Sequence, residues 1–212
     1  MSEAGVDEAG RGPVIGPLVI ACVVLNSTGL AFLRSYLRDS KELTPRARSR
    51  IYRLIESAAE EIKVRVLEPR EIDQAVESFE RGLNELEAVA TAELIDSLEQ
   101  HVETVYVDSP DPLPDRYAEM ISSRLRRSTV LVVAANRAES MFPHVAAASI
   151  VAKVERDRAI EELKREYGDF GSGYPSDPKT RRFIQQLASQ GRELPPIVRR
   201  SWKTLDKLAH LG

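Results

Sequence analysis

Residues 18–25 read L-V-I-A-C-V-V-L, a continuous apolar run of strand length. A strand that is covered on both faces shows such a run, whereas a half-exposed strand alternates apolar and polar residues. We therefore predict a buried strand here. Further strands are predicted at 63–67, at 104–107 (ending at Asp108) and at 130–135.

Helical patterns alternate with these strands along the chain. Thr44 and Pro45 suit the start of a helix, helical periodicity follows at 84–100, and a long helix is expected at 143–166, small and apolar in its first half and highly charged in its second. Strand–helix alternation predicts an α/β fold. We expect a main domain over residues 1–166, followed by a glycine- and proline-rich loop and a C-terminal helical appendage at 167–212, with short helices near 180–189 and 196–208.

The charge of the chain is unevenly distributed. The formal net charge is −3, yet residues 170–207 contain eight Lys/Arg against three Asp/Glu, so this segment carries +5 and the remainder −8. A basic end on an acidic body favours a polyanionic partner, although a solvated basic face is the plain alternative. The single cysteine, Cys22, excludes a disulfide framework and a cysteine-based zinc site. The apolar stretch 13–25 is too short to span a bilayer, so we expect a cytoplasmic protein without a membrane segment.

Acidic residues occur where the predicted strands end. Asp7 and Glu8 flank the apolar run, Asp108 ends a strand, and Glu139 follows another. Ligands gather at strand ends in open α/β sheets, and converging carboxylates need cations between them. Oxygen ligands favour Mg²⁺ or Mn²⁺, and two such ions about 4 Å apart serve phosphodiester cleavage. Most acids are merely solvated, however, and adjacent strand residues point to opposite faces, so the first two acids share a site only if the strand ends there.

The motifs of the chain resemble those of type 2 ribonucleases H, the ribonuclease HII family, over nearly its whole length. The opening D-E-A-G-R-G-P-V-I-G-P-L-V-I-A (7–21) carries the resemblance first. The others are D-S-K (39–41), L-N-E-L-E (83–87), V-Y-V-D (105–108), A-A-S-I-V-A-K-V-E-R-D-R (147–158), Y-G-D-F-G-S-G-Y-P-S-D-P-K-T (167–180) and V-R-R-S-W-K-T (198–204). The last two resemble the archaeal and eukaryotic branch.

The resemblance implies an RNase H-like mixed sheet flanked by helices, with a small C-terminal helical segment. It also implies an endonuclease that cuts the RNA strand of RNA/DNA hybrids and cuts at ribonucleotides embedded in duplex DNA, using two Mg²⁺ or Mn²⁺ ions and leaving 3′-OH and 5′-phosphate ends. The implied metal ligands and catalytic residues are Asp7, Glu8, Asp108 and Glu139. The fourth is usually an aspartate, so the glutamate here leaves that ligand and the metal preference open.

Substrate contacts are implied for a second set of residues. Gly10, Arg11 and Gly12 resemble the G-R-G element that grips the ribonucleotide, with glycines that allow close backbone approach and an arginine that can supply charge for a phosphate. Tyr174 would stack on the sugar and sense the 2′-OH; packing of a loop aromatic is the alternative. The implied phosphate contacts are Lys41, Ser149, Lys153, Arg181, Arg200 and Lys203, and a helix bearing Arg199, Arg200, Lys203 and Lys207 would fold over the duplex.

Two other functions compete with this hypothesis: an inactive nucleic-acid-binding module and a junction resolvase of the same fold group. Retained carboxylates disfavour the first, and a loop that reads a 2′-OH disfavours the second. We expect a monomer. The C-terminal L-A-H-L-G shows no aromatic pair of the kind that docks on sliding clamps.

Overall fold

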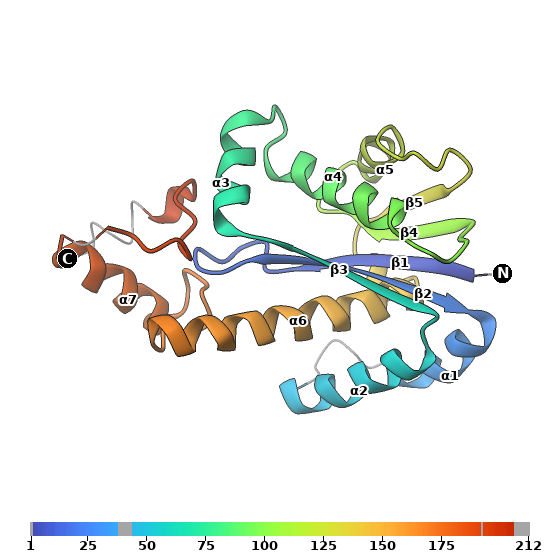
Figure 1. The fold of residues 1–212 in the computed structure, drawn as a ribbon, viewed down its shortest axis with the longest axis horizontal. Helices are drawn as coiled ribbons and strands as arrows, with labels where there is room; N and C mark the ends of the chain where they lie inside the picture. The colour runs from blue at the N-terminus through green and yellow to red at the C-terminus, as the bar shows by residue number, and fades with distance from the viewer. Residues whose placement is uncertain (1, 38–43, 192, 206–212) are drawn as a thin grey trace.

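A computed structural model describes residues 2–37, 44–191 and 193–205. A five-stranded sheet forms its centre, in the order β3-β2-β1-β4-β5 (Figure 1). The strands are β1 (Ser2–Ala9), β2 (Leu18–Asn26), β3 (Glu61–Leu67), β4 (Thr104–Asp108) and β5 (Leu131–Ala135). β1, β2 and β3 pair antiparallel, whereas β1, β4 and β5 are parallel. The mixed sheet confirms the predicted α/β class.

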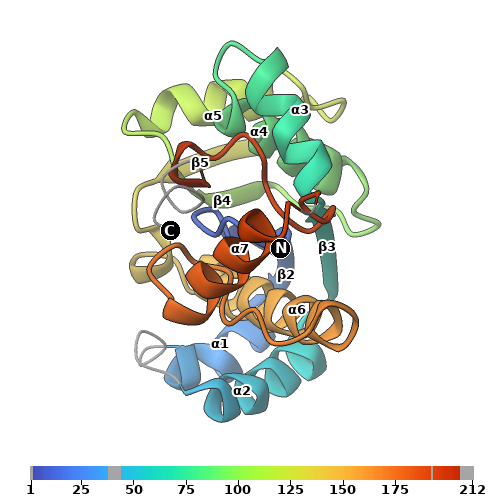
Figure 2. The same cartoon turned by 90° about the vertical axis from the view of Figure 1, so that its left-hand side faces the viewer.

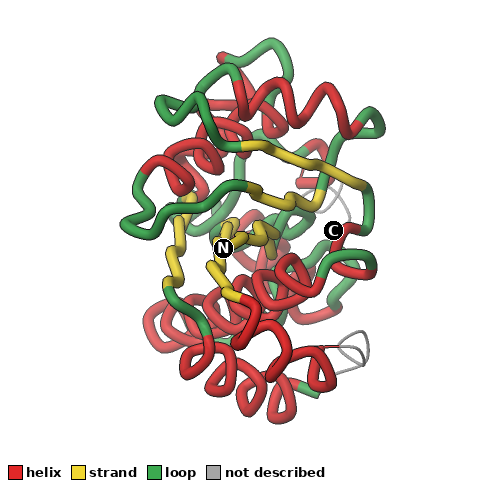
Figure 3. The backbone as a smooth tube through the Cα atoms, turned by 90° about the vertical axis from the view of Figure 1, so that its right-hand side faces the viewer, coloured by secondary structure: helices red, strands yellow, loops and turns green. Residues whose placement is uncertain are grey.

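The position of strand β2 in the sheet explains its apolar sequence. Its even-numbered side chains, such as Ile20 and Cys22, face one core beneath α3 (Pro69–Ser78), α4 (Leu83–Asp96) and α5 (Pro114–Ser122). Its odd-numbered side chains, such as Ala21 and Val23, face a second core with α1 (Ser27–Leu37), α2 (Pro45–Ala58) and α6 (Pro143–Tyr167). Figures 2 and 3 show the sheet between these two helical layers. Burial on both faces is the reason for the unbroken apolar run.

The sequence predicts four strands and four helices close to their observed positions, α7 (Pro178–Ser189) included. It misses strand β1 and the helices α1, α3 and α5. These elements are short or carry acids and glycines that obscure their periodicity; β1 reads S-E-A-G-V-D-E-A. The helix expected at 196–208 is wrong in its first half, because residues 193–202 form an extended and turned segment and helix begins only at 203.

The C-terminal segment packs against the sheet domain. Ile197, Val198 and Phe170 share a buried cluster with Val14 and Ile160. An isolated bridge joins Ile15 to Val198, which excludes a helix at that point. The division of the chain at residue 166 stays a prediction, since this cluster draws on both sides of it. No helix within the described ranges is long and apolar enough to cross a membrane.

Candidate active site

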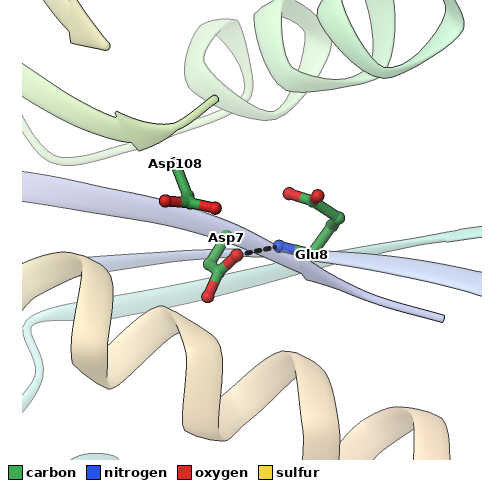
Figure 4. A group of neighbouring side chains, drawn as sticks. All are labelled: Asp7, Glu8 and Asp108. Atoms are coloured by element: carbon green, nitrogen blue, oxygen red, sulfur yellow. Dashed lines mark hydrogen bonds between the residues drawn. The ribbon is translucent and has the colours of Figure 1, made fainter. Parts of the chain in front are cut away.

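Three carboxylates meet where the parallel strands β1 and β4 part. The pairing of β1 with β4 stops at Val6 and Val107, so Asp7 and Asp108 are the next residues on each strand. With Glu8 they form a group in which one carboxylate oxygen from each residue lies within 4.8 Å of the others (Figure 4). The sequence prediction that these three acids converge is therefore confirmed.

The reason for the convergence differs from the one predicted. Strand β1 does not end at these residues, because Asp7 and Glu8 still pair with Ala21 and Ile20 of β2. The two side chains leave opposite faces of β1, as strand geometry requires. Only the β4 side of the strand has lost its partner, and both carboxylates reach that open edge. The backbone N–H of Glu8 donates to Asp7 Oδ1 at 2.7 Å, which fixes the first carboxylate.

Burial makes the ionised forms of these acids unfavourable. It raises the pKa of Asp7 to about 7, with a further contribution from the charge of Asp108 and an opposing hydrogen bond from Ser149. Burial also raises the pKa of Glu8 well above its ordinary value, and the charge of the nearby Glu87 adds to the effect. Carboxylates in this state bind a cation at the expense of their protons.

Asp108 and Glu139 form the outer part of this group. Asp108 Oδ1 accepts a 2.6 Å hydrogen bond from the N–H of Ala138, in the 3₁₀ helix η2 (Ala138–Ser140). Burial, together with the charge of Glu139 and a side-chain hydrogen bond with it, raises the pKa of Asp108 to about 6. Glu139 thus contacts Asp108 but does not belong to the three-carboxylate group. Its role as a fourth ligand stays a prediction.

One lysine of α6 lies beside the acids. Lys153 Nζ donates to Ser149 Oγ at 2.7 Å, and its charge lowers the pKa of both Asp7 and Asp108. Asp7 itself is 7% exposed and accepts a hydrogen bond from Ser149. The sequence predicts phosphate contacts for this lysine and serine, and those contacts stay predictions; in the structure both side chains lie beside the carboxylates. One lysine leaves most of the negative charge uncompensated, and the all-oxygen donor set fits Mg²⁺ or Mn²⁺.

A groove of about 500 Å³ opens beside Glu8. It is lined by Glu8, Ala9, Gly10, Arg11, Gly12, Arg48, Lys153, Arg156, Asp157, Ser172 and Tyr174, so half of the predicted substrate contacts lie along it. Tyr174 is 39% exposed, and a Cβ built on Gly12 would lie 3.5 Å from its ring. Gly10 has φ 94°, and its Cα faces the Arg156 side chain. Both the conformation and the lack of space favour glycine at position 10.

The guanidinium of Arg11 is engaged within the protein. It forms an ion pair with Glu87 of α4 and donates to Asn84 Oδ1 at 2.5 Å. The sequence expected this arginine to be available for a phosphate. The Glu87 side chain is 1% exposed, and burial raises its pKa to about 7 although the charge of Arg11 opposes the shift. Sequence reasoning gave Glu87 and Asn84 no role, although L-N-E-L-E was among the motifs it singled out.

The predicted place of Arg199 is wrong, because this residue is fully buried rather than on a helix over the duplex. Its guanidinium donates to the backbone carbonyls of Gly10 at 2.6 Å, Arg11 at 3.1 Å and Gly16 at 2.9 Å. Its own N–H donates to Val14 O at 2.9 Å. The C-terminal segment is therefore the support on which the glycine-rich turn is built.

The remaining predicted contacts lie outside the groove or outside the described part of the chain. Arg181 Nε donates to Pro175 O at 2.7 Å, next to Tyr174, and is exposed. Arg200 is exposed and donates to Leu194 O at 2.8 Å, and Lys203 is exposed at the start of the last helical turn. Lys41 and Lys207 lie outside the described residues.

Known proteins share both the sequence and the fold. The family model for ribonuclease HII matches residues 4–205. The ribonuclease HII of Thermofilum pendens is 49% identical over 210 residues, covering 97% of this chain and 98% of the relative. The ribonuclease H2 of Pyrococcus horikoshii superposes with a TM-score of 0.89 at 43% identity, covering 99% of this chain and 97% of the other.

A structure described as the PCNA:RNase HII complex from Archaeoglobus fulgidus gives a TM-score of 0.88 at 39% identity, covering 99% of this chain and 98% of the other. These relatives are archaeal, in agreement with the branch that the C-terminal motifs indicate. Family model, sequence and fold agree over almost the full length, and the chain belongs to the ribonuclease HII family of divalent-metal-dependent RNase H endonucleases.

Proposed function

We propose that this protein hydrolyses the RNA strand of RNA/DNA hybrids, and cuts at single ribonucleotides embedded in duplex DNA, with two divalent ions and 3′-OH and 5′-phosphate products. The observation that carries the proposal is the partly buried group of Asp7, Glu8 and Asp108, of which Glu8 lines a groove with a glycine turn and an exposed tyrosine. Mg²⁺ or Mn²⁺ bound by these acids, with Glu139 as the fourth, would activate a water and stabilise charge on the phosphate.

The chain's own side chains prepare the acids for this role. Ser149 holds the Asp7 carboxylate, while the Ala138 N–H holds that of Asp108. Lys153 bonds to Ser149 and adds positive charge beside both acids, so it helps to keep them ionised. Fixed orientation of the ligands before substrate arrives reduces the rearrangement needed in the reaction.

The turn at Gly10–Gly12 and the Tyr174 ring would supply recognition of the ribose. The ring lies over Gly12 at the groove wall, and its exposed face can stack on a sugar. The guanidinium carbon of Arg156 lies 5.3 Å from the ring centroid, a cation–π contact that holds the ring in place. A hydroxyl on the sugar is what separates RNA from DNA, so this wall favours a ribonuclease over a junction resolvase.

The proposal is tested with three matched duplexes: a hybrid, a DNA duplex with one ribonucleotide, and an all-DNA duplex. Each is incubated with Mg²⁺, Mn²⁺ or EDTA, and the product ends are identified. We expect cleavage of the first two duplexes only, with either ion and not with EDTA. Cleavage of the all-DNA duplex at a comparable rate would contradict it.

Monomeric state and the lack of a sliding-clamp motif stay predictions, since residues 206–212 lie outside the described residues.

A further inference from the structure

Two residues of the L-N-E-L-E motif, Asn84 and Glu87, contact Arg11 in the groove wall. Glu87 lies on α4 and its side chain is 1% exposed, yet it forms an ion pair with the guanidinium of Arg11. Its second oxygen, Oε1, is buried and has no hydrogen-bond partner among the residues that the structure describes. A buried carboxylate is costly unless it is paired, so the contact with Arg11 accounts for its presence in this core.

Asn84 extends the contact to the other side of the site. Its Oδ1 accepts from Arg11, and its Nδ2 donates to Asp111 Oδ2 at 3.2 Å. Asp111 follows β4 and is 1% exposed. Its backbone carbonyl accepts from Asn136 Nδ2 at 2.8 Å, just after β5. One polar network therefore joins the glycine turn to the ends of both strands beside the carboxylates.

Arg199 holds the same turn from the C-terminal segment. It occupies the carbonyls of Gly10 and Arg11, whereas the N–H groups of Arg11 and Gly12 have no acceptor within the described ranges. A turn whose carbonyls are taken and whose N–H groups are free presents donors to a ligand oxygen. The position of those donors depends on the two side chains that fasten the turn.

We propose that Arg11 and Glu87 form a positioning pair, called here the Arg11–Glu87 clamp: the guanidinium fastens the turn to α4 and does not contact a phosphate. The clamp rests on the proposed function, because it sets where the ribonucleotide meets the turn. The planar guanidinium of Arg11 donates to Glu87 and Asn84 at once, which a lysine at position 11 cannot reproduce. A displaced turn loses the single ribonucleotide first, since misplacement by about 1 Å can cost about a hundredfold in rate.

The test is a double-mutant cycle with Arg11→Met, Glu87→Met and the double variant. We expect a fall of about a hundredfold in kcat/KM on the single-ribonucleotide duplex for each, with no further loss in the double variant. The slope of log affinity against log salt stays at the wild-type value, because no phosphate contact is removed. Arg11→Lys behaves like Arg11→Met. Arg11→Met leaves the buried Glu87 carboxylate unpaired, whereas the double variant leaves no buried charge unpaired and so still reports the effect of the lost pair if Arg11→Met fails to fold.

Glu85→Met is the matched control. Glu85 lies on the same helix, but its ion pair, 2.7 Å long, is with Arg124 and not with the turn. It should keep wild-type selectivity. A salt slope shallower by about one in Arg11→Met, with full activity in Glu87→Met, would show a phosphate contact and overturn the clamp. Wild-type cleavage of all-DNA duplex would overturn the proposed function instead; selectivity retained by both single variants would overturn the clamp alone.

Discussion

The carboxylate group and the glycine turn lie next to each other, but they differ in how far the protein itself pairs their charged groups. Where β1 and β4 part, Asp7, Glu8 and Asp108 lie together with Lys153 beside them, and burial raises the pKa of all three acids. At the turn, Arg11 is paired with Glu87, and Arg199 is saturated with backbone carbonyls. The first region has more negative than positive charge, whereas the charged groups of the second are paired within the protein.

This difference distinguishes the carboxylates, which can bind cations, from the turn, which is held in a fixed position. A group of acids that the protein does not neutralise can be completed by a cation from solution. A turn whose charges are already matched gains little from an ion, and its fixed backbone can serve recognition. Substitutions should accordingly abolish chemistry in the first region and change selectivity in the second.

The largest effect is expected at the carboxylates. Asp7→Asn or Asp108→Asn removes a metal ligand, whose stabilisation of the transition state is worth several kcal/mol, so cleavage should fall by about a thousandfold or more. The fold should survive, because the raised pKa of Asp7 shows that its ionised form is unfavourable there. Initial rates measure the loss of cleavage, and thermal unfolding measures whether the fold is retained. Activity of Asp7→Asn within about tenfold of wild type would remove the two-metal interpretation.

An intermediate effect is expected at Tyr174. Tyr174→Ala should lose about tenfold to a hundredfold on a single embedded ribonucleotide, since one contact worth about 1–3 kcal/mol goes unmade. A continuous RNA strand offers several registers, so its loss should be smaller.

Glu139→Asp serves as the comparison for this substitution, because it keeps the charge beside Asp108 and should be tolerated or shift the Mg²⁺/Mn²⁺ preference. Rates for both variants on both substrates, at one salt concentration, provide the measurement. Equal losses for Tyr174→Ala on the two substrates would assign the ring to packing.

The smallest effect is expected at the exposed cations of the C-terminal segment. Arg200→Ala and Lys203→Ala should each make the slope of log affinity against log salt shallower by about one, with little change in cleavage at low salt. Both side chains are exposed, unlike the buried Arg199, so their loss leaves the fold intact. Equilibrium binding of a hybrid at several salt concentrations gives the slope. An unchanged slope in the double variant would mean that the segment only supports the turn.

Much of the fold follows from local sequence, because β2 is a continuous apolar run and α6 is 25 residues long. Strand β1 was missed for a physical reason: its residues include the acids and glycine that the site requires, so its pattern follows chemistry rather than burial. Gly5 of β1, for instance, lies against the backbone of His144 at the start of α6, where a Cβ has no room. That need is set by tertiary packing.

The candidate site was predictable as a set of acids, but its internal pairs were not. Local sequence gives no sign that Arg199 is buried while Arg200 beside it is exposed. The partners of Arg199 are carbonyls more than 180 residues away. The Arg11–Glu87 pair likewise joins α4 to the turn across the chain. Such partners are determined only when the segments pack together.

The central claim is that the carboxylate group is incomplete until cations bind, and proton release on Mn²⁺ binding tests it directly. At about pH 6 the group retains protons, because the pKa of Asp7 is raised to about 7 and that of Glu8 lies well above its ordinary value. Cations bind the ionised form, so calorimetry in buffers of different ionisation enthalpy should show net proton release, and affinity should rise with pH through this range. Asp7→Asn should lose both the binding and the release. Tight Mn²⁺ binding without proton release, unchanged in Asp7→Asn, would contradict the account.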